Sequence, residues 1–128
     1  DERLSIIKTI KTITTMKATE IIEKSFSETQ IVVIKSIVRF GLWGDCSHEM
    51  ANGETKEAWG YFTSGVKVGG YTSRQISGII SGIVKTIREK KFDFMNHAAD
   101  YWETDSTDEG VLFFSDEVMD EIEKWASK

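Results

Sequence analysis

The sequence predicts a mainly α-helical protein with a small β-hairpin. Apolar residues recur at intervals of three and four positions in several segments, which is the spacing of a helix with one buried face. Two of these segments begin with a helix-capping motif, and the chain contains no proline, a residue that interrupts helices. A chain of 128 residues is long enough to bury one hydrophobic core, so we expect a single domain, 1–128.

Two helices are expected in the first third of the chain. Between Leu4 and Ile22 the apolar residues mostly lie three or four positions apart, which favours a helix over 1–26 despite many β-branched side chains. Ser27-Glu28-Thr29-Gln30 then matches the capping box, in which the serine caps a backbone amide and the glutamine reaches back. This motif predicts a second helix that ends near Gly41 and buries Ile31, Ile34, Ile37 and Val38.

The middle of the chain is expected to contain little regular structure. Leu42 to Gly53 is rich in glycine, asparagine, serine and aspartate and shows no periodicity, so we expect a loop. Glu54 to Phe62 is expected to form a short helix, because its apolar residues would share one face. Val66 to Tyr71 contains two adjacent glycines and is expected to form a turn.

Thr72 to Lys91 gives the clearest helical pattern. Thr72-Ser73-Arg74-Gln75 repeats the capping box at the start of this segment. The apolar residues that follow lie at positions i, i+3, i+4, i+7, i+8 and i+11, on one side of a helix: Ile76, Ile79, Ile80, Ile83, Val84 and Ile87. We therefore predict one amphipathic helix with a buried isoleucine stripe and a small, polar, basic outer face.

A β-hairpin and a final helix are expected next. Phe92 and Phe94 alternate with polar neighbours, and the acidic stretch 103–110 separates them from the apolar run 111–114, which fits two strands joined by a polar loop. A short helix over 95–102 is the alternative. The final helix, 116–128, is expected to begin after Ser115 as its cap, with acids in the first turn where the helix dipole favours them.

Charge is unevenly distributed along the sequence. The formal net charge of the whole chain is −5, which by itself disfavours a nucleic-acid partner, because phosphate binding needs lysine and arginine. Thr72 to Lys91, however, has a net charge of +4 from five basic residues and one acid, whereas Phe92 to Lys128 has a net charge of −9 from eleven acids and two lysines. Such segregation is informative about partners rather than about fold.

This order of elements resembles the winged helix-turn-helix regulators, particularly those of the MarR type. The resemblance rests on Thr72 to Lys91 as recognition helix, on Arg88-Glu89-Lys90-Lys91-Phe92 where such domains pass into the wing, and on Phe113-Phe114-Ser115 before the final helix. It implies a winged-helix-like core over 27–115 and terminal helices, 1–26 and 116–128, that form a homodimer. The resemblance further implies a transcription regulator that binds double-stranded DNA.

The outer face of the predicted helix carries the candidate site. Gly78 and Gly82 lie on it, and each interior glycine costs about 1 kcal/mol relative to alanine in a helix. Small side chains let a helix approach the major groove, hydroxyls bond phosphates or base edges, and arginine or lysine reaches guanine. On this interpretation the DNA-binding residues are Arg74, Gln75, Ser77, Ser81, Lys85 and Arg88. The alternative is that the glycine and serine face packs closely against another helix.

Catalytic chemistry is not expected. Asp45 to Glu49 brings together a thiol, an imidazole and two carboxylates, but a catalytic cysteine needs a base within hydrogen-bond reach, which sequence neighbours rarely provide. The spacing of Cys46, His48 and His97 matches no metal-binding motif, and Gly65 to Gly70 lacks the ending of a phosphate-binding loop. We therefore expect no enzyme activity, no cofactor and no metal.

The sequence also gives expectations about cellular location and partners. Cys46 is the single cysteine and cannot form an intramolecular disulfide, which favours a reducing, cytoplasmic location. Apolar runs fall far short of the roughly 20 residues that span a bilayer, so no membrane contact is expected. The alternative function is a non-enzymatic protein-interaction module, in which the glycine and serine face or the acidic C-terminal third docks a protein partner.

Overall fold

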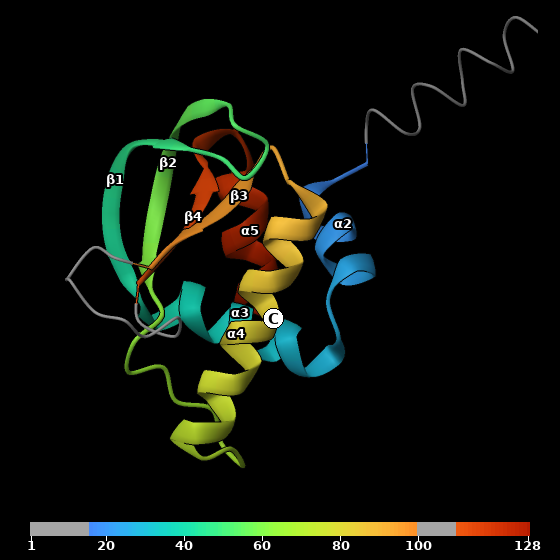
Figure 1. The fold of residues 1–128 in the computed structure, drawn as a ribbon, viewed down its shortest axis with the longest axis vertical. Helices are drawn as coiled ribbons and strands as arrows, with labels where there is room; N and C mark the ends of the chain where they lie inside the picture. Colours follow the sequence, from blue (N-terminus) through green and yellow to red (C-terminus); the bar gives the residue numbers. More distant parts are fainter. Residues whose placement is uncertain (1–15, 100–109) are drawn as a thin grey trace, which may run out of the picture.

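The computed structural model describes residues 16–99 and 110–128, which form an α+β fold (Figure 1). Within these residues, helices pack on one face of a four-stranded antiparallel sheet. The expected mainly α, winged-helix-like architecture is therefore wrong, because two strands occupy the middle of the chain. The elements are α2 (Ala18–Ser25), α3 (Glu28–Phe40), β1 (Leu42–Glu49), β2 (Thr55–Phe62), α4 (Ser73–Lys90), β3 (Met95–Ala98), β4 (Val111–Ser115), the 3-10 turn η1 (Asp116–Val118) and α5 (Met119–Ala126).

The sheet has the strand order β1-β2-β4-β3, with β1 and β3 at its edges. β1 and β2 form a hairpin, and the chain then crosses through α4 to β3 before β4 inserts beside β2. Pairing of β3 with β4 confirms two paired strands after the long helix, but the first of them begins at Met95, beyond the Phe92 and Phe94 on which the prediction rested. Met95–Ala98 is strand rather than the alternative helix. Instead of forming an isolated wing, these two strands complete the sheet.

The β1–β2 hairpin turns through a short loop and bends over the sheet. Gly53 adopts a left-handed conformation at the end of this loop, where its amide donates to the carbonyl of Met50. The backbone amide of Ala51 donates to the carbonyl of Met95, and the side-chain amide of Asn96 donates to the carbonyl of Glu49 at 2.7 Å. These bonds join the hairpin to the opposite edge strand, so the sheet is strongly curved.

Two hydrophobic clusters follow from this curvature. The larger cluster lies between the helices and one face of the sheet, where Leu112 and Phe114 of β4 point. The smaller cluster fills the concave face with Met50, Ala58, Val111 and Phe113. Alternate residues of β4 therefore serve different clusters, as the period of a strand requires.

Both predicted capping boxes are confirmed. The Ser27 hydroxyl accepts from the amide of Gln30 at 3.2 Å, and the Thr72 hydroxyl accepts from the amide of Gln75 at 3.1 Å. In each case the glutamine Oε1 accepts from the backbone amide of the cap residue. These bonds satisfy amides that have no partner inside the helix, and they fix the starts of α3 and α4.

Other expectations about the ends of elements were wrong or lie outside the described residues. Ser115 makes no side-chain capping bond, and the final helix begins with a 3-10 turn before α5. The expected helix over 1–26 is described only from residue 16 onward, where it contains α2. The acidic loop expected at 103–110 lies outside the described residues except for Gly110.

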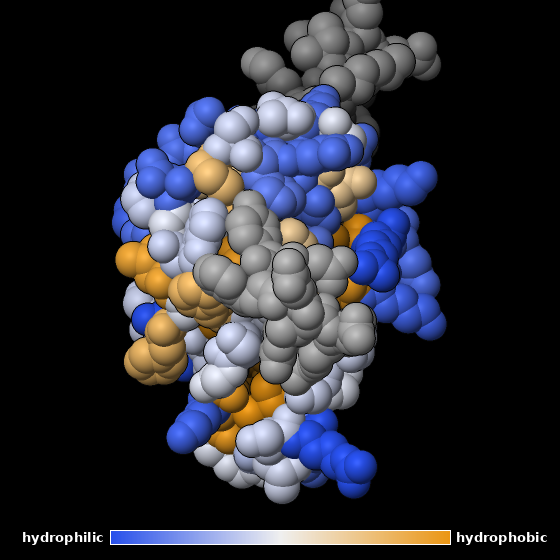
Figure 2. Space-filling model, turned by 60° about the vertical axis from the view of Figure 1, so that its left-hand side comes forward, coloured by the Kyte–Doolittle hydropathy of each residue, from blue (hydrophilic) through white to orange (hydrophobic). Residues whose placement is uncertain are grey.

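Within the described residues from 16 onward, no helix-turn-helix precedes α4. The residues expected to form a loop and a short helix, 42–62, form β1 and β2, and a connection of residues 63–72 leads from β2 to α4. Among the described residues, no helix has both the length and the apolar character needed to cross a membrane. Figure 2 shows the side of the molecule that carries the β1–β2 hairpin, where apolar areas break up a hydrophilic surface.

Candidate functional site

α4 presents one face to the core and the opposite face to solvent. Its isoleucine stripe is buried, with Ile80 and Ile83 each 2% exposed and Ile87 fully buried. Five of the six predicted DNA-binding residues are exposed, and Ser77 is half-buried. Helical periodicity places five of the six along one side, over about 21 Å from the first to the last Cα atom: Arg74, Ser77, Ser81, Lys85 and Arg88.

The two glycines of the outer face have different surroundings. A methyl group at Gly78 would meet no atom within 4 Å, so this position is open. A methyl group at Gly82 would lie 3.0 Å from the Nε2 atom of Gln30, at the start of α3. The glycine and serine face is therefore open in its N-terminal half, and at Gly82 it meets the end of one side chain rather than a packed helix.

The polar side chains of this face are partly engaged by the helix itself. The Ser81 hydroxyl donates to the carbonyl of Ser77 at 3.1 Å, and the Thr86 hydroxyl donates to that of Gly82 at 3.1 Å. The side-chain oxygen of Gln75 accepts from the amide of Thr72, so Gln75 has a structural role in the cap. Serine hydroxyls bonded back to the helix still have acceptor capacity toward an outside donor.

The basic residues of α4 are not neutralised by acids of the described chain. Within residues 16–99 and 110–128, no carboxylate oxygen lies within 4.0 Å of Arg74, Lys85 or Arg88. Their charge is therefore available to an outside anion. Arg88 also acts inward, because its positive charge and the burial of His97 together lower the pKa of that imidazole, with burial the larger cause.

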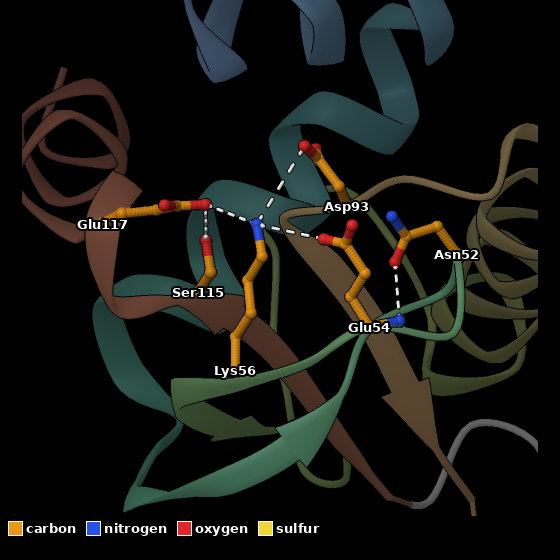
Figure 3. Close-up of polar contacts among 6 residues, drawn as sticks. All are labelled: Asn52, Glu54, Lys56, Asp93, Ser115 and Glu117. Carbon is orange, nitrogen blue, oxygen red and sulfur yellow. Dashed lines mark hydrogen bonds and ion pairs between the residues drawn. The ribbon is translucent and has the colours of Figure 1, made fainter.

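Lys56, by contrast, is surrounded by acids (Figure 3). Its Nζ atom donates to Glu117 Oε1 at 2.6 Å and lies 3.7 Å from Glu54 and 4.0 Å from Asp93. The hydrogen bond to Glu117 is the main cause that raises the pKa of Lys56. These acids come from the β1–β2 loop, the connection between α4 and β3, and the turn before α5, so the charge of Lys56 is balanced within the described residues.

The group from Asp45 to Glu49 does not form a nucleophile and base pair. The alternation of β1 places Cys46 and His48 over the concave face, where the His48 ring stacks on Phe113 with centroids 3.8 Å apart. His48 Nδ1 lies 2.7 Å from the carbonyl oxygen of Glu49. Burial, and then the charges of Asp45 and Glu57, raise the pKa of the Cys46 thiol, which disfavours the reactive thiolate. Among the described residues, no three histidine, cysteine or acidic side chains are grouped as metal ligands.

A groove that sequence reasoning missed lies at the C-terminal end of α3. It has a volume of about 560 Å³ and lies between that end and the beginning of the connection from β2 to α4. Phe40 borders it and is 78% exposed, which is unusual for a large apolar side chain. The available signal was that Phe40 lies outside the buried stripe of its helix, next to Gly41.

Comparison with known proteins gives no family. No protein-family model, no curated protein and no solved structure matches the chain. The winged-helix resemblance therefore gains no support from relatives, and the two candidate sites rest on their own residues. Of these, the outer face of α4 combines unpaired positive charge with an open surface, and the groove beside Phe40 combines volume with apolar walls.

Proposed function

We propose that this protein binds double-stranded DNA through the outer face of α4. The observation that carries the proposal is the open surface at Gly78, flanked by cations that no described carboxylate neutralises. An α-helix fits the major groove, and a position without a side chain allows its backbone to approach closely. Arg74, Lys85 and Arg88 would neutralise phosphates, and Ser77 and Ser81 would contact the duplex between them.

The position of α4 in the fold supports this proposal. Figure 1 shows the N-terminal turns of α4 extending beyond the lower end of the sheet, away from β3 and β4. A helix that projects in this way can enter a groove without the sheet meeting the phosphate backbone. Gln75 would contribute through the cap that orients the first turn, because its oxygen is bonded to the amide of Thr72.

The proposal extends to a regulator that acts as a homodimer in the reducing interior of a cell. A dimer would present two copies of α4 to successive turns of the duplex, about 34 Å apart. Ile22 is buried in the core of the protein itself, so the expected dimer contact is the earlier part of the predicted apolar stripe, from Leu4 to Ile13, which lies outside the described residues. Cys46 would remain a thiol in that compartment. Analytical ultracentrifugation of the full chain tests the dimer separately from DNA binding.

The first experiment measures duplex binding at several salt concentrations by fluorescence anisotropy. Wild-type affinity is expected to fall linearly with salt on a double logarithmic plot, as counterion release requires. The Arg74→Ala, Lys85→Ala double variant should lower the slope by about 2. Lys124→Ala with Lys128→Ala, which removes two exposed lysines at the end of the chain, is the matched control and should keep the wild-type slope.

A second variant tests the close approach of the α4 backbone to the groove without changing the charge of the protein. Gly78→Gln adds a side chain to an open position and improves helix propensity, so the fold should remain intact. Duplex binding should weaken at least tenfold if the backbone at Gly78 lies against the groove, a loss of about 1.4 kcal/mol. The proposal is lost if the wild type shows no salt-dependent binding, or if Gly78→Gln leaves duplex binding unchanged. Dissociation of a dimer by Gly78→Gln would assign the face to a protein contact instead.

A further inference from the structure

The groove beside Phe40 has the dimensions and chemistry of a small-molecule site. Its volume of about 560 Å³ lies within the range of roughly 300–1,000 Å³ found for ligand pockets. Its walls come from the end of α3, the end of β2 and the connection that follows β2. The lining side chains that carry the argument are Ser36, Phe40, Phe62, Ser64, Val66 and Lys67.

The floor of the groove is held by backbone contacts. The amide of Phe62 donates to the carbonyl of Gly41, which ties the end of α3 to the end of β2. A methyl group at Gly41 would lie 2.4 Å from the carbonyl oxygen of Phe62 and 2.8 Å from that of Ile37. Only glycine permits this approach, so the two elements that form the floor are fixed relative to each other. Ser36, also on the floor, is 3% exposed.

The walls of the groove combine apolar surface with one positive charge. Phe40, Phe62 and Val66 supply apolar contacts, and Ser36 and Ser64 supply hydroxyls. Lys67 is the charged residue of the lining, and no acid is present among the described residues that line the groove. A ligand that matches this set has a flat apolar body and one negative group.

We propose that this groove binds a small aromatic carboxylate. The carboxylate would pair with the Lys67 ammonium and accept from the Ser64 hydroxyl, and the ring would lie between Phe40 and Val66. Phe40, which is 78% exposed in the structure, would be covered by the ring, so its burial contributes to affinity. The site is separate from the outer face of α4, and its test contains no DNA.

The probe for this site is 2-naphthoate, titrated into the full chain labelled with 15N. Shifts of amide resonances are expected at Gly41, Ser64 and Gly65, which line the groove, and not along α5. The neutral counterpart, 2-naphthalenemethanol, has the same ring without the charge and should bind more weakly. Equal binding of the two probes, or shifts spread over unrelated surfaces, would overturn the proposal.

Two variants assign the contacts. Lys67→Gln should weaken 2-naphthoate by about fivefold and leave 2-naphthalenemethanol unchanged, because an exposed ion pair contributes little more than that. Lys24→Gln on α2 is the matched control and should change neither. Phe40→Ser should weaken both probes, and its exposure means that the fold does not depend on it. Unaltered 2-naphthoate binding in Lys67→Gln, or absence of wild-type binding at 1 mM probe, about the weak end of ligand affinities, contradicts the site.

Discussion

The two faces of α4 come from one helix but have opposite environments. The inner face buries Ile80, Ile83 and Ile87 against the other helices and the sheet, and each is at most 2% exposed. The outer face carries Gly78 in open space and basic residues without acidic partners in the described chain. Stability therefore depends on the inner face and the proposed binding on the outer face. Substitutions on the two faces should separate these properties.

The largest effect is expected from the inner face. Ile87→Ala would leave a cavity beside a fully buried side chain and should lower the free energy of unfolding by about 2–5 kcal/mol. Urea unfolding followed by circular dichroism measures this change. Ile79→Ala, at a half-buried position of the same helix, is the control and should cost clearly less. Similar losses at both positions would mean that the inner stripe does not set stability.

The next effect concerns His97, on β3. Both ring nitrogens are buried without a hydrogen-bond partner among the described residues, and burial followed by the charge of Arg88 lowers the pKa of His97 to about 4. The unfolded chain, with an ordinary pKa near 6.5, binds the proton more readily, so stability rises with pH between about 4 and 6.5. The free energy of unfolding is therefore expected to be about 3 kcal/mol lower below the folded pKa than above the unfolded pKa.

His97→Leu tests this dependence, because leucine fills the site without a titrating group. As the pH falls from 7 to 4, the free energy of unfolding of the wild type should fall by about 3 kcal/mol more than that of the variant. NMR titration of the imidazole gives the folded pKa directly. Parallel stability curves for the two proteins would show that His97 does not titrate between these values.

The helices were predictable because their signals are local. The capping boxes at Ser27 and Thr72 involve residues three positions apart, and the isoleucine stripe of α4 follows from the helical period alone. Periodicity also grouped the outer residues of α4 onto one face. It could not say what that face contacts, and the surroundings of Gly78 and Gly82 differ only because of the distant residue Gln30.

The strands β1 and β2 were missed because their patterns are not local. β2 lies between β1 and β4 and is covered on both faces. Ala58 faces the smaller cluster and its neighbour Trp59 faces the larger one, so apolar and polar residues do not alternate along this strand. Along β1, the concave face is filled by Cys46 and His48 rather than by large aliphatic residues. The dipeptide Asn52-Gly53 was an available hairpin signal. The groove beside Phe40 depends on residues from separate elements and could not be seen before they were placed.

A smaller effect is expected from the open glycine of α4. Gly78→Ala adds a methyl group where no atom lies within 4 Å, so it should raise the free energy of unfolding by about 1 kcal/mol through helix propensity. The midpoint of urea unfolding measures this gain. Duplex binding by the same variant should also be measured. If Gly78→Ala is more stable than the wild type but binds the duplex more weakly, the glycine lowers stability and in return allows close approach to the groove. A loss of stability at Gly78→Ala would mean that this face is covered.

The smallest effect is expected at Gly82. The gain in helix propensity from Gly82→Ala is offset, because its methyl group would lie 3.0 Å from Gln30 Nε2, and the Oε1 of the same amide accepts from the amide of Ser27. A shift of this amide weakens the cap of α3, so the net change should stay within about 0.5 kcal/mol of zero. In a Gln30→Ala background the obstacle is gone, and Gly82→Ala should then gain about 1 kcal/mol, as at Gly78. The same gain in both backgrounds would show that Gln30 yields without cost, and that the two halves of the outer face of α4 are equally open.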